Sequence, residues 1–302
     1  MAMRTLLETV DSSPAGAVGA LPAPLAGGPA AAVEEALREA VARASSEDCP
    51  PRLRDALAYS VFPGGARLRP QLCLAVAVAT GAGDLATAIA AAAALELIHC
   101  ASLVHDDLPC FDSADTRRGK PSVHRMFGEP IALLAGDALI VLAFETLGRT
   151  PRAHAMVSVL ARATGAARGI IGGQAWESEP VAPLDTYHRA KTAALFEAAA
   201  ELGALSSGAK AQGWRELGLA LGRAYQAADD VADAAGNAEI LGKPTGVDEA
   251  HGRPSLARVA GVDGARRRGR ELLVEAVYLI PPCPQQHVIR TFLDTLAIRV
   301  GL

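Results

Sequence analysis

Residues 96–120, ELIHCASLVHDDLPCFDSADTRRGK, place two aspartates, Asp106 and Asp107, at the end of an apolar stretch, and Asp112 six residues after the first. This spacing puts Asp112 about 240° around a straight helix from Asp106, so one helix cannot present both carboxylates on one face. Pro109 lies between them and is well placed to end the helix, because proline lacks a backbone N–H and clashes with the preceding turn. A turn after the helix would bring Asp112 back towards Asp106.

Three basic residues, Arg117, Arg118 and Lys120, follow this acidic cluster. Carboxylates bind hard cations such as Mg²⁺, and guanidinium groups bind phosphate oxygens as two-pronged forks. Acidic and basic groups this close together are consistent with a polyanion between them, with Mg²⁺ on one side and arginine on the other. Diphosphate is such a polyanion.

A second acidic cluster lies in residues 225–233, YQAADDVAD. Asp229 and Asp233 are four apart, so a helix places both on one face, and Gln226 continues the stripe. The flanking residues are largely apolar, and buried carboxylates must be paired or bind a metal ion. Oxygen ligands without histidine or cysteine favour Mg²⁺ over Zn²⁺. A solvated helix face is the alternative for either cluster alone, but two such clusters, one followed by RRGK, argue against it.

The composition predicts an all-α fold. Half of the 302 residues are apolar and only 4% are aromatic, and alanine and leucine are abundant. No segment alternates cleanly enough to predict a strand, and Pro and Gly clusters separate about ten or more helical segments. Residues 12–32 are rich in Pro, Gly and Ala and carry no charge. We therefore expect a flexible leader over residues 1–32 and a single helical domain over residues 33–302.

Charge and cysteine usage limit the partners and the compartment. The net charge of −4 gives no reason to expect a nucleic-acid or anionic-membrane partner. Five cysteines without a CxxC pair predict a reducing, cytoplasmic environment. Asp84, Glu96 and Asp137 interrupt the apolar runs, and we expect no membrane span.

The motifs together resemble those of trans-isoprenyl diphosphate synthases. The order GGxRxRP, DDxxxxD-RRG, GGQ, KT, YQxxDDxxD and GKP matches that family over about residues 33–300. The resemblance implies a helical bundle around a deep central cavity, in a homodimer. It also implies that isopentenyl diphosphate condenses head to tail (1′-4) with allylic diphosphates, with about three Mg²⁺ ions as cofactors and the released diphosphate as the base.

The same resemblance assigns roles to individual residues. It implies that metal ions bind directly to Asp106, Asp112 and Asp229, with Asp107, Asp230 and Asp233 as further ligands or as supports behind them. The allylic diphosphate would contact Arg117, Lys191 and Lys243, with Thr192 and Gln226 nearby. The isopentenyl diphosphate would contact Arg69, His99 and Arg118. The group whose side chains would carry the chemistry is Asp106, Asp112, Arg117, Lys191, Asp229 and Lys243.

One of these assignments has support from spacing alone. His99 precedes Asp106 by seven residues, or two helical turns, so both lie on one face of a helix. A buried structural histidine is the alternative.

The resemblance implies that product length depends on the cavity below the first acidic cluster, where Ala101 and Ser102, just before Asp106, are both small. Family members with short products commonly carry an aromatic side chain at one of these positions. We therefore expect geranylgeranyl diphosphate as the product, with a farnesyl diphosphate synthase as the alternative.

The sequence departs from the family pattern where Ala66 and Val247 replace lysines. These losses put the affinity for isopentenyl diphosphate in doubt, though not the ionising chemistry. A weakly active regulatory subunit of a hetero-oligomeric synthase is an alternative, against which the two intact acidic motifs argue. A terpene cyclase or head-to-head synthase is a further alternative, against which the second aspartate motif argues. The variants PGGARLRP (63–70) and GRPS (252–255) resemble those of bacterial geranylgeranyl diphosphate synthases from carotenoid pathways.

Overall fold

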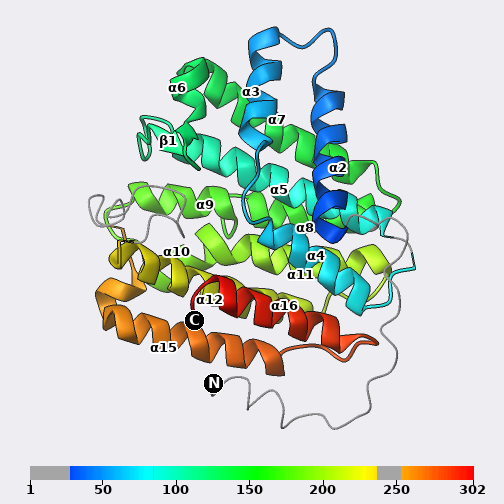
Figure 1. The fold of residues 1–302 in the computed structure, drawn as a ribbon, viewed down its shortest axis with the longest axis vertical. Helices are drawn as coiled ribbons and strands as arrows, with labels where there is room; N and C mark the ends of the chain where they lie inside the picture. Colours follow the sequence, from blue (N-terminus) through cyan, green and yellow to red (C-terminus); the bar gives the residue numbers. More distant parts are fainter. Residues whose placement is uncertain (1–27, 84, 237–252) are drawn as a thin grey trace.

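The computed structural model describes residues 28–83, 85–236 and 253–302, and these residues form a helical bundle (Figure 1). The described α-helices are α2 (Gly28–Ala44), α3 (Pro51–Val61), α4 (Leu68–Ala79), α5 (Ala86–Asp106), α6 (Val123–Phe127), α7 (Glu129–Gly148), α8 (Ala153–Thr164), α9 (Ile170–Ala175), α10 (Leu184–His188), α11 (Ala194–Ser207), α12 (Trp214–Ala234), α15 (Leu256–Tyr278) and α16 (Gln286–Arg299). A 3₁₀ turn, η2 (Trp176–Ser178), and a π-helical segment, η3 (Arg189–Ala193), complete them. The all-α prediction is confirmed.

Helix α5 is the centre of the bundle. It packs on α4, α7 and α11, while α11 also contacts α12, and α12 contacts α15. Figure 1 shows these helices lying in roughly parallel rows, with α2 and α3 crossing them at one end. Alanine is the best helix former and its small side chain lets neighbouring helices come close, so the buried run 91–94 of four alanines suits a central helix.

A buried ion pair joins the start of α4 to the middle of α5. The Arg67 guanidinium donates to Glu96 Oε1 at 2.6 Å and to Glu34 Oε1 at 2.7 Å. Removing one partner would leave an uncompensated buried charge, which is strongly destabilising. These contacts fix the GGxRxRP segment, so that Arg69 lies in the first turn of α4.

The RRGK stretch forms a short hairpin, which the sequence did not predict. Strand β1 (Thr116–Arg117) pairs antiparallel with β2 (Lys120–Pro121). The two residues between them, Arg118 and Gly119, have φ values of 52° and 74°. Positive φ at both positions is the geometry of a tight two-residue hairpin loop. The strands could not be predicted from the sequence, because two residues are too few to show an alternating pattern. For arginine this backbone conformation costs on the order of 1 kcal/mol.

The first described helix begins earlier than the sequence suggested. Helix α2 begins at Gly28, so residues 28–32, which we assigned to the leader from their composition, belong to this helix. Residues 1–27 lie outside the described part of the chain.

Two helices, α5 and α7, are long and apolar enough to cross a membrane by length and composition. The expectation that Glu96 and Asp137 keep the apolar runs below spanning length is therefore wrong, because each helix tolerates its charge within an otherwise apolar window. The apolar 18-residue window of α5 is 72% buried inside the protein, and that of α7 is 44% buried. A mostly buried helix such as α5 passes this test as a core helix does, and two such helices are weak evidence for a membrane span.

Candidate active site

A cavity of about 1050 Å³ is bounded by α5, α9, η3, α12 and the hairpin loop. Of the residues predicted to form a site, those that line it are Arg69, His99, Ser102, Asp106, Asp112, Arg117, Arg118, Lys191, Thr192, Gln226 and Asp229. These residues are therefore brought together from four separate stretches of sequence: Arg69, residues 99–118, Lys191 with Thr192, and Gln226 with Asp229. Lys243 and Val247 lie outside the described residues.

The first acidic cluster adopts the turn that its spacing predicted. Helix α5 ends at Asp106, three residues before Pro109. The backbone N–H of Asp112 donates to the carbonyl of Asp106 at 2.9 Å. This turn places both side chains on the wall of the same cavity.

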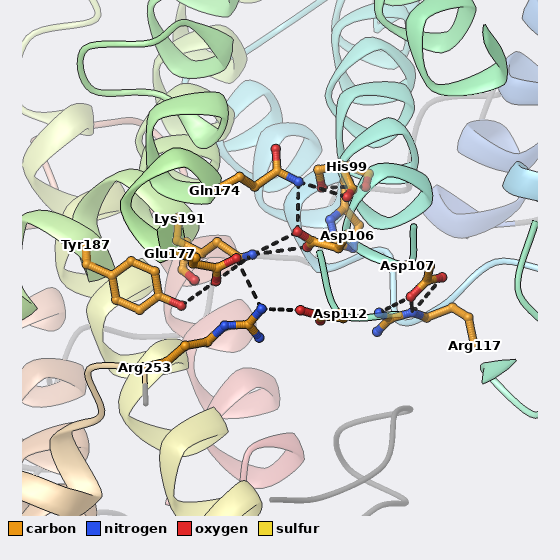
Figure 2. A network of polar contacts seen from close by, with 12 residues as sticks. His99, Asp106, Asp107, Asp112, Arg117, Gln174, Glu177, Tyr187, Lys191 and Arg253 are labelled. Atoms are coloured by element: carbon orange, nitrogen blue, oxygen red, sulfur yellow. Dashed lines mark hydrogen bonds and ion pairs between the residues drawn. The ribbon is translucent and has the colours of Figure 1, made fainter. Parts of the chain in front are cut away.

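Each of these two aspartates contacts a cation (Figure 2). Lys191 Nζ lies 3.0 Å and 3.1 Å from the two carboxylate oxygens of Asp106, and Asp112 pairs with Arg253. Gln174 Nε2 also donates to Asp106 at 2.9 Å. Burial alone would raise the pKa of Asp106, but Lys191 and the Gln174 hydrogen bond outweigh it and hold the pKa below its usual value. Asp106 is therefore ionised and suited to bind a cation.

Asp107 has a different position from Asp106. Its side chain does not line the cavity, and it accepts hydrogen bonds from Arg117 Nη2 at 2.5 Å and Nε at 3.1 Å. Burial raises the pKa of Asp107 even though Arg117 opposes the shift. Of the two roles left open for Asp107, this geometry favours a support that positions Arg117.

In the second acidic cluster, too, one aspartate lines the cavity and its neighbour lies behind the cavity wall. Asp229 lines the cavity. Asp230 is buried and accepts hydrogen bonds from Gln226 Nε2 at 2.8 Å and from the backbone N–H of Leu256 at 2.6 Å. Asp230 thus ties α12 to the first turn of α15 behind the cavity wall. Asp233 is not among the described residues that line the cavity.

The GGQ motif explains how Lys191 reaches the acidic cluster. A Cβ atom on Gly173 would lie 2.4 Å from both Lys191 Cα and Lys191 N, so only glycine permits this approach of α9 to η3. Lys191 and Thr192 lie on the π-helical segment, a conformation that occurs frequently at functional sites. Thr192 Oγ1 donates to Gln226 Oε1, which links η3 to α12.

A second group of basic residues lies beside the acidic clusters. The Arg69 guanidinium stacks 5.0 Å from the ring centroid of Phe196 and 5.9 Å from that of Tyr225. Within the described residues, Arg69 Nε and His99 Nδ1 are buried without a hydrogen-bond partner, and no ion pair includes Arg69 or Arg118. Burial lowers the pKa of Arg69, and burial together with the nearby arginines holds the pKa of His99 far below its usual value. Unsatisfied donors beside uncompensated cations are suited to bind an anion.

Gly65 makes room for one of these cations. A Cβ atom there would lie 2.6 Å from Arg118 Nη2, so the guanidinium occupies the space that any other side chain would take. Ala66 next to it also lines the cavity and adds no charge. Arg69, Arg118 and His99 therefore form a second polar group in the cavity, in which both arginines carry positive charge.

Four cavity or network residues were missed from the sequence: Gln174, Glu177, Tyr187 and Arg253. Gln174 belongs to the GGQ motif, whose sequence alone predicts no contact for this side chain. Glu177 lies three positions after Gln174, one helical turn away, and this spacing was the signal that could have linked it to the motif.

The aspartates suit magnesium, but they are not arranged as a finished metal site. No group of three acidic, histidine or cysteine side chains in the described ranges is close enough to hold a metal ion. Asp106, Asp112 and Asp229 nevertheless offer only oxygen ligands around one cavity, which is the set that Mg²⁺ prefers in diphosphate sites.

A helical bundle with carboxylates and cations around one cavity, and a second cationic group beside them, defines a diphosphate-binding class of enzyme. Comparisons with known proteins give the family. A family model described as Polyprenyl synthetase matches residues 50–285. The chain is 50% identical over 273 residues to the geranylgeranyl diphosphate synthase of Cereibacter sphaeroides, covering 89% of this chain and 95% of that protein.

Solved structures agree with this match. Geranylgeranyl pyrophosphate synthetase from Pyrococcus horikoshii is similar with a TM-score of 0.75 at 29% identity, covering 90% of this chain and 95% of that one. A geranyltransferase from Helicobacter pylori, complexed with magnesium and isoprenyl diphosphate, gives a TM-score of 0.73 at 28% identity, covering 92% and 99% of the two chains. The chain belongs to the polyprenyl synthetase family.

Proposed function

We propose that this protein is a Mg²⁺-dependent trans-prenyltransferase that adds isopentenyl diphosphate to allylic diphosphates and makes geranylgeranyl diphosphate. The observation that carries the proposal is the pairing of two anion sites in one cavity, one beside Asp106, Asp112 and Asp229 and one formed by Arg69 and Arg118. The relative from Cereibacter sphaeroides, which bears the name of this activity, supports it.

The first site would bind the allylic diphosphate as the leaving group. Asp106, Asp112 and Asp229 would hold Mg²⁺, which offsets the charge that develops on the departing diphosphate. Lys191 lies on the same wall and can donate to the diphosphate oxygens once it leaves Asp106. Groups fixed in place before the reaction stabilise such charge without reorganising during it. The allylic C–O bond breaks, and its electron pair leaves with the diphosphate.

The second site would hold isopentenyl diphosphate close to the allylic carbon. Arg69 and Arg118 supply charge, and the neutral His99 can donate a hydrogen bond. Holding the two substrates side by side makes their reaction effectively unimolecular. The isopentenyl double bond forms the new C–C bond, and a proton then leaves to the released diphosphate. Since Ala66 replaces a lysine of the family pattern, we expect a raised KM for isopentenyl diphosphate.

The C20 product is proposed from the small side chains at Ala101 and Ser102. Ser102 lines the cavity one turn below Asp106, and its hydroxyl donates to the carbonyl of His99 at 2.8 Å. Ala101 is buried and does not line the cavity. Ser102 is therefore the position where a larger side chain would first meet the growing prenyl chain.

We propose a homodimer, because helices α6 and α7 expose a set of large apolar side chains. Met126, Leu133, Leu134 and Val141 are each about half exposed or more. Light scattering is expected to give about twice the chain mass of 31.0 kDa, and Leu134→Glu should halve it. A wild-type mass of one chain would contradict this proposal.

We also propose that the protein is located in the cytoplasm and supplies a carotenoid pathway. All five cysteines are free, which suits a reducing compartment. The pathway rests on the PGGARLRP and GRPS variants alone.

Activity of the chain purified alone tests the proposed function. Labelled isopentenyl diphosphate with farnesyl diphosphate and Mg²⁺ should give a C20 product, and chelation of Mg²⁺ should abolish it. Absence of elongation with any allylic starter would contradict the proposal and favour the regulatory-subunit alternative.

A further inference from the structure

Glu177 is a buried carboxylate in the wall of the cavity, and no role was assigned to it from the sequence. It lies in the turn η2, and its side chain is only 6% exposed. Its Oε1 lies 2.9 Å from Lys191 Nζ and accepts a hydrogen bond from Tyr187 at 2.7 Å, while its Oε2 lies 3.4 Å from Arg253 Nη2 (Figure 2). Glu177 therefore lies between two cations.

Each of these cations also contacts an aspartate of the first acidic cluster. Lys191 contacts Asp106, and Arg253 contacts Asp112. Under the proposed function, Asp106 and Asp112 bind metal ions together with the allylic diphosphate and so exchange these partners for Mg²⁺. Among the described residues, Glu177 is then a carboxylate that still touches both cations.

We propose that Glu177 is a positioning residue that keeps Lys191 and Arg253 directed at the allylic diphosphate when Asp106 and Asp112 turn to the metal. The inference rests on the proposed function of this cavity and deepens it. Long lysine and arginine side chains lose much rotamer freedom when they are held in one place. A fixed carboxylate between them reduces the freedom that must be lost on binding.

Tyr187 orients Glu177 in turn. Its hydroxyl donates to the same oxygen, Oε1, that contacts Lys191. A carboxylate held in this way has one orientation and presents its other oxygen to Arg253. Tyr187→Phe would remove this hydrogen bond and leave the ring and the charge of Glu177 in place.

Titration calorimetry with inorganic pyrophosphate at saturating Mg²⁺ tests the proposal on the full chain. Glu177→Gln keeps the shape of the side chain and removes its charge, and we expect the Kd to rise about tenfold, the effect typical of losing charge-assisted hydrogen bonds. Simple electrostatics predicts the opposite, since removing a negative charge next to a bound anion tightens binding. A Kd that is unchanged or lower in Glu177→Gln would overturn the proposal.

Three further variants separate positioning from other roles. Glu177→Asp keeps the charge and should recover part of the affinity, and Tyr187→Phe should raise the Kd by about threefold. Asp185→Asn removes an equal charge from a side chain that is 80% exposed and should leave the Kd unchanged. A change confined to the Mg²⁺ concentration needed for half-saturation would instead make Glu177 a metal ligand and overturn the proposal.

Steady-state kinetics separate this inference from the proposed function. In Glu177→Gln the KM for the allylic diphosphate should rise, while the KM for isopentenyl diphosphate stays the same, because Arg69 and Arg118 do not contact Glu177. Equal increases in both would indicate a general loss of structure and contradict the positioning role. A wild-type chain that binds pyrophosphate with Mg²⁺ but transfers no prenyl group would refute the proposed function, and the calorimetry would still decide the role of Glu177.

Discussion

Replacing Gly173 by alanine should displace Lys191 and thereby impair prenyl transfer. The added Cβ atom would lie 2.4 Å from Lys191 Cα and N, whereas ordinary contacts begin at 3.4 Å. The two segments must therefore separate by about 1 Å. Lys191 Nζ now lies 3.0 Å from Asp106 and 2.9 Å from Glu177, and a shift of this size would stretch both contacts beyond hydrogen-bonding distance.

This displacement should lower both the catalytic rate and the folding stability. A misplacement of about 1 Å in a group that positions a substrate can cost about a hundredfold in rate, which corresponds to about 2.7 kcal/mol of barrier. Overpacking of a filled interior costs about 1–3 kcal/mol of folding stability. We expect Gly173→Ala to remain folded and to lose about two orders of magnitude in kcat/KM for the allylic substrate.

The assay is steady-state incorporation of labelled isopentenyl diphosphate, with thermal unfolding measured on the same samples. Gly148→Ala, at the end of α7, is the matched control, because no atom lies within 4 Å of its added Cβ. It should match the wild type in rate and be at least as stable, because alanine favours a helix more than glycine does. If Gly173→Ala kept more than about a third of the wild-type rate, the position of Lys191 would not depend on this contact and the reasoning would be wrong.

Three further predictions concern product length, thiols and acid stability. Ser102→Phe should shorten the product to C15 by chromatography of the dephosphorylated prenols, and Ala101→Phe should do so less; unchanged length in both would refute the cavity argument. Exposed Cys110 should react with an aromatic disulfide in the native state, while Cys73, whose pKa burial raises to about 12, should react only after unfolding; equal rates would contradict their burial. Burial and neighbouring arginines hold the pKa of His99 well below 6.5, so the unfolded chain gains a proton first as the pH falls. The free energy of unfolding should therefore decrease as the pH falls through about 6.5. Between pH 7.5 and 5.5, the urea midpoint of His99→Gln should decrease less than that of the wild type, and equal decreases would refute this prediction.

The sequence predicted those features of the site that depend on local geometry. The turn after Asp106 follows from a proline and an awkward helical spacing, and it is present. The shared face of His99 and Asp106 follows from a seven-residue spacing on one helix, and both line the cavity. Local patterns of this kind need no knowledge of which helices pack together.

Features that depend on packing could not be predicted. Asp106 and Asp107 are adjacent and identical, yet only Asp106 lines the cavity, because the end of α5 decides which way each side chain points. Glu177 contacts Arg253, which is distant in sequence. Arg118 adopts a positive φ that its residue type disfavours. These outcomes are set by tertiary contacts that override local preference.

The most direct test of the central claim is the chain length of the product made by the purified chain alone. Labelled isopentenyl diphosphate and dimethylallyl diphosphate are incubated with Mg²⁺, and the prenols are separated after dephosphorylation. We predict a Mg²⁺-dependent C20 product. A C15 product would agree with prenyl transfer but contradict the role of Ala101 and Ser102 in product length. No product with any allylic starter would contradict the proposed prenyl transfer, with Ala66 as the first residue to test for the loss of isopentenyl diphosphate binding.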